Sequence, residues 1–308
     1  MDALSPDLFA KILNRDDCHR FVETHLGRSA AHFTECTFPD LGFDLPRFYE
    51  VLRDTVWGSK ADLKFLADRE KDSAPVDWSS FVTEQGVLTL DQILRLKAAR
   101  TTIYARQMHL RDQSLRHLVQ SLGRTGYFRA RVNAFFTPAH GRGTAIHFDQ
   151  HDVLALQVHG SKIWTVDQTP VVENVMFEMG ELDGVDLKFR APTEYHLKAG
   201  EALYVPRGVM HSVETLDEDS LHLVVGLRAL NWHDVALHWV EREMKTNPAI
   251  RAPVPARVSQ EQAAAVFGAL SDPEVLQATI QSALKNRAMQ QGNLQFGQIF
   301  ARDIAKLL

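Results

Sequence analysis

The middle of this chain constrains its fold most, because its apolar side chains recur at every second position. Residues 127–136 alternate between polar and apolar side chains, which is the pattern of a strand with one buried face. Further strands are predicted at 153–158, 162–166, 201–205 and 221–227. Gly160 and Ser161 separate two of these strands by a plausible tight turn, so they are predicted to form a hairpin. The pattern indicates a core made mainly of strands.

The regions on either side of these strands have the apolar spacing of helices, which makes the expected fold class α+β. In the first region the predicted helices are Pro6–Leu13, Asp16–Leu26, Asp62–Glu70 and Thr89–Arg100. After Asn231 one helix is predicted to stop near Pro248, and two more are expected to follow the capping residues Ser259 and Ser271. We therefore expect a mainly helical scaffold over residues 1–124, packed on a β core over 125–230, and a helical appendage over 231–308.

The bulk properties exclude several classes of protein. A net charge of -5 and a pI near 6.3 provide no overall basic field, so nucleic acid is not expected as a partner. The 308 residues include only two cysteines, Cys18 and Cys36, which favours a reducing, cytoplasmic location over a secreted disulfide scaffold. No segment approaches the roughly 20 apolar residues that span a bilayer, so no membrane association is predicted.

A second constraint is a short run of possible metal ligands, His147, Asp149 and His151. On a strand these three side chains would share one face, because side chains alternate. His211 follows an apolar strand and a Pro206-Arg207-Gly208 turn, which would redirect the chain into a pocket. Two histidines and one carboxylate on one side of a metal leave three positions open for co-substrate and oxygen.

The choice of ligands has competing interpretations. With fourteen histidines in the chain, a chance His-x-Asp pair is easily found, and the motif alone is weak. Its strand context and the distant His211 strengthen it. His151 is a rival to Asp149, since both lie on one predicted strand face. Iron chemistry that needs open positions prefers one carboxylate with two histidines, so we assign His147, Asp149 and His211 as ligands and His151 as part of the surrounding wall.

The run from His147 to Trp164 resembles the core of the bacterial cupin-like JmjC proteins related to ribosomal oxygenases. Leu203–His211 and Ser220–Leu223 are similar to that family's second metal-ligand strand and to the strand after it. The resemblance covers residues 125–230 and implies a JmjC/cupin double-stranded β-helix. It also implies an oxygenase that uses iron(II), 2-oxoglutarate and O2 to hydroxylate a side chain of a protein or peptide.

The resemblance further implies which residues hold the co-substrate. Lys162 would bind the distal carboxylate of 2-oxoglutarate, with hydrogen bonds from Thr144 and Asn133, and Ser220 and His222 fall near the matching pocket wall. A lysine suits this role, because a compact cation can neutralise a carboxylate that is desolvated in the barrel. Without the resemblance, Lys162 would be interpreted as a solvated strand lysine and Asn133 as a bridge between strands.

Two other functions stay open. One is a cupin metalloenzyme that does not use 2-oxoglutarate, in which Lys162 has no carboxylate to bind. The other is a catalytically inactive JmjC-like module for binding or dimerisation, which the presence of every expected ligand disfavours. Ribosomal oxygenases carry a helical dimerisation region and a winged-helix domain, and residues 231–308 have room for the first but hardly for both. A ribosomal protein and a biosynthetic peptide are therefore equally compatible substrates.

Two surfaces are predicted to bind partners. Residues 167–187 contain six acidic side chains and no lysine or arginine, which would attract a basic substrate if the segment overhangs the barrel mouth. The alternative is a solvated loop. The helices after Asn231 are predicted to build a homodimer, or else to pack on the catalytic domain. Their apolar faces include Val235, Trp239, Val266, Phe267, Val275 and Ile280.

Overall fold

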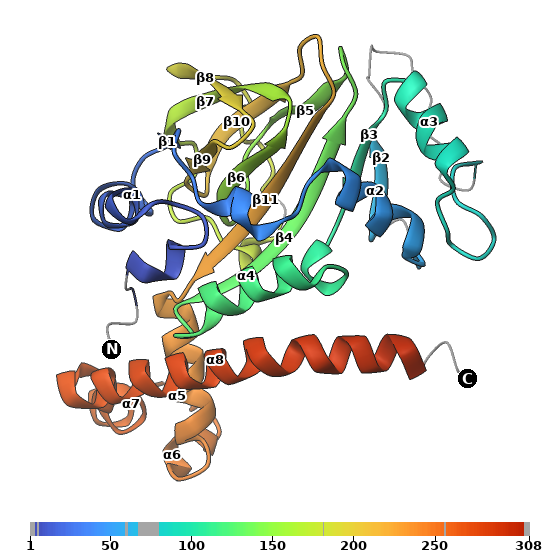
Figure 1. The fold of residues 1–308 in the computed structure, drawn as a ribbon. Coiled ribbons are helices and arrows are strands. Elements are labelled where there is room, and N and C mark those ends of the chain that lie inside the picture. The colour runs from blue at the N-terminus through green and yellow to red at the C-terminus, as the bar shows by residue number, and fades with distance from the viewer. Residues whose placement is uncertain are drawn as a thin grey trace. The chain divides into compact units, whose positions relative to one another are not determined.

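The computed structural model describes residues 4, 6–58, 61–66, 80–180, 182–255 and 257–304 (Figure 1). The chain divides into two compact units. The larger unit contains residues 4–122 and 130–228, and the smaller contains residues 123–129 and 229–308. The predicted fold class, a β core with helices before and after it in the sequence, is confirmed.

The larger unit begins with short helices whose first turns are capped by side chains. Asn14, Asp44 and Thr89 each accept a hydrogen bond from a backbone N–H in the helix that follows, as polar residues at this position commonly do. The helical elements are η1 (Pro6–Phe9), α1 (Arg15–Arg20), the π-helical turn η2 (Phe21–His25), η3 (Phe38–Leu41), α2 (Leu45–Asp54), α3 (Leu90–Ala98), η5 (Met108–Leu110) and α4 (Gln113–Gly123).

Two sheets form the core of this unit. The seven-stranded sheet has the order β1-β9-β6-β11-β4-β3-β2, and the four-stranded sheet has the order β5-β10-β7-β8. The strands of the first are β1 (Ala31–Phe33), β2 (Leu63–Leu66), β3 (Thr102–Ala105), β4 (Phe128–Thr137), β6 (Asp152–His159), β9 (Ala202–Val205) and β11 (Ser220–Ala229). Those of the second are β5 (Arg142–His147), β7 (Ser161–Pro170), β8 (Pro192–Lys198) and β10 (Val209–Glu214).

Apolar side chains from both sheets meet in one buried cluster, which shows that the sheets face each other. Val153 and Ala155 of β6 and Val224 of β11 contribute from the larger sheet, whereas Trp164 and Val166 of β7 contribute from the smaller. Figure 1 shows the two sheets arranged around this interior. Because residues at intervals of two along a strand share one face, polar residues that alternate in step with these apolar ones also face the space between the sheets.

The predicted hairpin over residues 153–166 is wrong. β6 pairs with β9 and β11 in one sheet, whereas β7 pairs with β8 and β10 in the other. Gly160 therefore lies at a corner where the chain passes between sheets. Its φ of 64° suits a glycine, and a Cβ there would overlap with the backbone oxygen of Asp219. Such a corner has the same local signature as a hairpin turn, because both need a residue with positive φ.

Two other predictions on local structure are corrected. The helix predicted over Asp62–Glu70 is wrong where the structure describes it, because Leu63–Leu66 is strand β2, while residues 67–70 lie outside the described residues. Pairing of β2 with β3, which in turn pairs with β4, holds this segment extended. The strand expected to run through Asp149 and His151 ends at His147, so the next residues form a loop before β6.

The smaller unit is helical, as predicted. It contains α5 (Trp232–Glu243), α6 (Pro248–Arg251), α7 (Gln260–Phe267), η7 (Gly268–Ser271) and α8 (Pro273–Ile304). Capping boxes at Asn231 and Ser259 begin α5 and α7. An ion pair joins Arg287 to Asp234, with Nη1 and Oδ2 2.6 Å apart. None of the helices in the described part of the chain is long and apolar enough to cross a membrane.

Candidate metal centre

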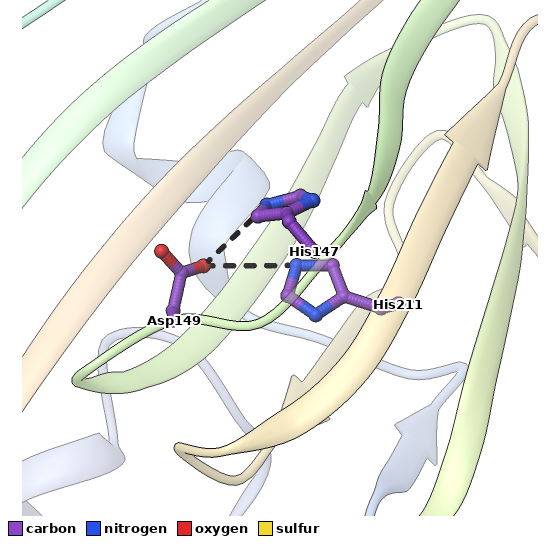
Figure 2. Close-up of side chains that lie close together, drawn as sticks. All are labelled: His147, Asp149 and His211. Atoms are coloured by element: carbon purple, nitrogen blue, oxygen red, sulfur yellow. Dashed lines mark ion pairs between the residues drawn. The ribbon is translucent and has the colours of Figure 1, made fainter. Parts of the chain in front are cut away.

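Three side chains offer metal-ligating atoms that all lie within 4.8 Å of one another: His147, Asp149 and His211. Figure 2 shows His147 at the end of β5, Asp149 on the loop that follows and His211 on β10. An oxygen of Asp149, Oδ2, lies 3.6 Å from His211 Nε2 and 4.0 Å from His147 Nε2. The three residues assigned as ligands from the sequence are therefore brought together on one side of a small space.

Strand pairing places the two histidines. His147 of β5 and His211 of β10 are directly opposed residues of an antiparallel pair, and their ring centroids are 4.3 Å apart. Asp149 reaches the same space because the chain leaves β5 after His147 and bends. The backbone oxygen of Asp149 accepts a 2.9 Å hydrogen bond from the N–H of Gly208, in the turn that leads into β10. The two ligand-bearing segments are therefore joined directly.

Backbone hydrogen bonds determine which ring nitrogen of each histidine is available. His147 Nδ1 lies 2.8 Å from the backbone oxygen of Ala145, and His211 Nδ1 lies 3.1 Å from that of Val209. A carbonyl oxygen can only accept, so in both rings Nδ1 carries a hydrogen and Nε2 is the nitrogen left to bind a metal. Both Nε2 atoms lie beside the Asp149 carboxylate.

The charge states of these groups also suit a cation. Burial, followed by the nearby His147, lowers the pKa of His211 to about 4, so its imidazole is neutral at neutral pH. Burial alone would raise the pKa of Asp149, but the surrounding imidazoles and the Arg131 guanidinium hold the pKa of this carboxyl below its ordinary value. A neutral histidine and an ionised carboxylate are the forms that bind metal. The donor set therefore fits a divalent cation such as iron(II).

The candidate ligands open into a cavity of about 240 Å³ between the two sheets. Trp164 of β7 and Val224 of β11 contribute apolar walls, and Lys162 lies on the same strand face as Trp164. The described lining residues are Lys64, Leu66, Tyr104, Asn133, Phe135, Gly143, Thr144, His147, Asp149, His151, Val153, Lys162, Trp164, His211, Val213, His222 and Val224.

Lys162 is the most unusual group in this cavity, because its side chain is fully buried. Its Nζ donates to Thr137 Oγ1 at 2.9 Å and lies 3.0 Å from His222 Nδ1. No carboxylate of the described residues lies within ion-pair distance of Nζ. Burial lowers the pKa of Lys162 to about 7. A buried amine without a counter-charge is costly, which favours an anionic ligand at this end of the cavity.

The other residues predicted to contact a co-substrate have different surroundings. Thr144 lines the cavity. Asn133 also lines it, but its Oδ1 accepts from the N–H of Gln107 at 3.0 Å and its Nδ2 donates to the Tyr104 hydroxyl at 3.2 Å. Ser220 is not among the described lining residues, and its Oγ accepts a 2.7 Å hydrogen bond from Gln157 Nε2.

Ser220 and His222 are two positions apart along β11, yet of the two only His222 is among the described lining residues of the cavity. Gln157, which bonds Ser220, is the residue of β6 directly opposite His222. A contact of this kind has no clear sequence pattern, because it depends on the partner strand.

His151 lies near the candidate ligands but does not belong to their cluster in the described structure. Its ring is buried, lies 5.8 Å from that of Phe177, and is accommodated because Gly226 has no Cβ. Its Nδ1 lies 3.2 Å from the backbone oxygen of Asp152. This position agrees with the interpretation of His151 as part of the wall.

Sequence reasoning missed several lining residues. Phe135 lines the cavity, and Thr137 bonds Lys162, and both follow Asn133 at intervals of two along β4. Trp164 follows Lys162 at the same interval along β7. The alternation of strand side chains is the signal that could have found all three, starting from a residue already assigned to the cavity.

Comparison with known proteins finds a matching family model and several similar proteins. Residues 103–235 match the family model described as the JmjC domain. Ribosomal oxygenase 2 of Bos taurus is 30% identical over 140 residues, which cover 42% of this chain and 29% of that protein. The bifunctional lysine-specific demethylase and histidyl-hydroxylase NO66 of Dictyostelium discoideum is 34% identical over 107 residues, covering 34% of this chain and 21% of that protein. The matches thus span under a third of these relatives' own lengths.

Solved structures show the likeness of the fold. YcfD, a ribosomal oxygenase from Escherichia coli in complex with cobalt and 2-oxoglutarate, superposes with a TM-score of 0.54 at 16% identity, covering 88% of this chain and 71% of that chain. The same protein in complex with cobalt and succinic acid gives a TM-score of 0.52 at 18% identity, covering 87% and 69%. The predicted fold of JmjC type is confirmed.

Proposed function

Residues 103–235 of this chain form a JmjC domain, and from that premise we propose that the chain is an iron(II)- and 2-oxoglutarate-dependent oxygenase that hydroxylates a side chain of a protein or peptide. The observation that carries the proposal is that one cavity holds both a two-histidine, one-carboxylate cluster and a buried lysine. The cluster suits a metal with open positions, and the lysine suits an anion bound beside that metal.

Each residue has a defined role in this proposal. His147, Asp149 and His211 hold the metal through the two Nε2 atoms and the carboxylate. Lys162 binds the distal carboxylate of 2-oxoglutarate, and Thr144 supplies a hydrogen bond. Asn133 and Ser220 were also assigned to the co-substrate, and both are engaged with protein groups. For Asn133 we propose a contact through the second hydrogen of Nδ2, whereas Ser220 would need to leave Gln157.

Bound iron would supply the redox chemistry by which O2 converts 2-oxoglutarate to succinate and carbon dioxide while its second oxygen atom enters a C–H bond of the substrate. The chain's own contribution is to bind, orient and shield. Trp164 and Val224 exclude water from the cavity wall, and Lys162 keeps the co-substrate at one end of it. No protein acid or base is required.

The alternatives differ in what they expect from Lys162 and the ligand cluster. A cupin metalloenzyme that does not use 2-oxoglutarate would leave the Lys162 amine buried without an anion. A catalytically inactive module would have no need to gather the Nε2 atoms of His147 and His211 beside the Asp149 carboxylate. Both alternatives are therefore less well supported by the site than the oxygenase is.

A protein substrate is supported by the relatives, whose names describe oxygenases of ribosomes and of histidyl side chains. We further propose that the substrate is basic, because Glu173 and Asp183 of the segment 167–187 are exposed. Asp186 is also exposed but pairs with Lys188. Glu178 pairs with Arg228, and Asp167 is buried and accepts from the backbone N–H groups of residues 190 and 191. Glu181 lies outside the described residues.

We also propose a cytoplasmic location and a homodimer built by residues 231–308. Val235 and Trp239, two of the residues assigned to the dimer face, are buried in the single chain and are not available to a partner. Phe267 and Val254 remain more than half exposed and border an apolar groove within the smaller unit. A second copy of the chain is the proposed occupant, and a concentration-independent monomer by light scattering would exclude it.

The direct test of the proposed function has two parts. The iron-loaded protein should consume 2-oxoglutarate and produce succinate, with slow turnover even without a protein substrate. Intact-mass analysis of candidate proteins and peptides should then reveal the gain of one oxygen atom in the true substrate. Absence of 2-oxoglutarate binding by the iron-loaded protein would refute the proposal.

A further inference from the structure

We propose that His222 is a second ligand of the co-substrate: its Nε2–H donates a hydrogen bond to 2-oxoglutarate, while its Nδ1 accepts one from Lys162. The inference rests on the proposed function and deepens it. It gives a role to a buried histidine whose place in the reaction is otherwise unassigned. His222 would thus contact the co-substrate itself, in addition to contacting Lys162.

Lys162 and His222 approach each other from different strands. Lys162 belongs to β7 and His222 to β11, so the pair bridges the two sheets across the cavity. Lys162 Nζ and His222 Nδ1 are 3.0 Å apart, and both residues line the cavity that holds the candidate metal ligands. His222 is 3% exposed. An anion that reaches the Lys162 ammonium must therefore pass close to the imidazole.

The charge of Lys162 determines where the imidazole of His222 carries its hydrogen. A charged lysine has three donors and no acceptor, so when Lys162 is charged His222 Nδ1 accepts from it and carries no hydrogen. Burial, followed by the nearby Lys162 cation, lowers the pKa of His222 well below its ordinary value. The ring is therefore neutral, and its single hydrogen lies on Nε2. No described protein group accepts from this Nε2–H, and an oxygen of the co-substrate would satisfy it.

The imidazole ring of His222 cannot easily rotate away from the cavity. It stacks on Phe135, with centroids 5.0 Å apart and planes inclined by 2°, and it meets Trp164 edge to face at 5.4 Å. Within the described structure, the contact with Lys162 is the only hydrogen bond made by the His222 side chain. Aromatic neighbours on two sides thus fix the plane of the imidazole while its second nitrogen remains available to a ligand.

Two substitutions separate a ligand from a residue that acts only through Lys162. His222→Asn keeps an acceptor near the position of Nδ1 but has no atom near that of Nε2. His222→Gln places an amide nitrogen near Nε2 but removes the acceptor at Nδ1. The measurement is the affinity of the zinc-loaded protein for 2-oxoglutarate by calorimetry, because zinc does not support turnover. His196→Gln, at an exposed position on β8, is the matched control and should bind as the wild type does.

His222→Asn should weaken 2-oxoglutarate binding about ten- to a hundredfold, which is the range for a hydrogen bond to a charged group. His222→Gln should weaken it less. Binding by His222→Asn at the wild-type affinity would overturn the inference. So would the reverse order of the two variants, because His222 would then act only by orienting Lys162. Both results would leave the proposed function intact. If the wild-type protein bound no 2-oxoglutarate, the proposed function itself would be refuted.

A measurement on the wild-type protein keeps the inference testable even if the variants fail to fold. In the zinc-loaded protein with ¹⁵N-labelled histidine, His222 should carry its hydrogen on Nε2, and 2-oxoglutarate should shift that Nε2–H resonance. A hydrogen on Nδ1, or an Nε2–H resonance that is unchanged at saturating 2-oxoglutarate, would overturn the inference.

Discussion

The N–H of Gly208 donates a 2.9 Å hydrogen bond to the backbone oxygen of Asp149, which links the loop carrying one candidate ligand to the turn that precedes another. Gly208 has a φ of 77°, and a Cβ there would overlap with the backbone oxygen of Val172. His211 follows this turn on β10. The geometry of the metal centre therefore depends on a residue that offers no ligand.

Replacing Gly208 by Ala should lower both stability and metal affinity. The positive φ alone costs about 1 to 3 kcal/mol for a residue with a side chain, and the overlap with Val172 adds to it. Gly200→Ala is the control, because Gly200 has a φ of 91° but no heavy atom within 4 Å of the added Cβ. Thermal unfolding and iron titration should show the larger loss at Gly208, and equal losses would contradict this role.

Replacing His211 by Ala should remove the metal while leaving the fold. The wild type should bind one iron per chain, and the variant should lose at least about a hundredfold in iron affinity. Replacing a residue that only supports a metal ligand already lowers metal affinity about ten- to a hundredfold. Elemental analysis of the purified proteins checks this, with His196→Ala as control at an exposed position. Stoichiometric iron in the His211 variant would eliminate that residue as a ligand.

Lys162→Ala should weaken 2-oxoglutarate binding but spare iron. It removes the buried cation without touching the ligand cluster, and a charged hydrogen bond is worth roughly 1.5 to 3 kcal/mol, or about ten- to a hundredfold in affinity. Calorimetry on the metal-loaded protein checks this, and Lys198→Ala at an exposed position serves as control. An unchanged dissociation constant would refute the assignment of Lys162.

Binding of 2-oxoglutarate should depend on pH in a direction that Lys162 determines. The pKa of Lys162 is lowered to about 7 by burial, so above pH 7 the amine of the ligand-free protein is mostly neutral. A bound carboxylate favours the charged form, hence binding takes up a proton and weakens as pH rises, by at most about tenfold per unit. Lys162→Arg stays charged throughout and should flatten the profile between pH 7 and about 9. A wild-type affinity independent of pH would contradict the prediction.

The acidic segment should matter only at low ionic strength if it recruits a basic substrate. Once a substrate is identified, neutralising Glu178, Glu181 and Asp183 together should raise KM at low salt and have little effect at high salt. The Debye length falls from about 10 Å at 0.1 M to about 3 Å at 1 M, which screens exposed charges. Since Glu178 is paired with Arg228, neutralising Glu173 and Asp183 alone is the matched comparison. An equal effect at both salt concentrations would argue against recruitment.

Strand and helix periodicities by themselves determined much of this protein. The alternation over 127–136 predicted β4, the helical spacing after Asn231 predicted α5, and the capping residue Ser259 correctly marks the start of α7. These features are local, because a strand or a cap is specified by residues close together in the chain. The cluster of His147, Asp149 and His211 was also assigned from sequence, through ligand chemistry and a family resemblance.

Only the tertiary structure decided which strands pair and what each polar group faces. Residues 153–158 and 162–166 look like a hairpin locally, yet they belong to different sheets. β2 and β3 are too short to show a period, and their pairing next to β4 holds them extended. His222 lines the cavity, whereas Ser220 does not and instead bonds Gln157 of the neighbouring strand β6. Pairing joins residues far apart in sequence, so its register is a property of the assembled sheet.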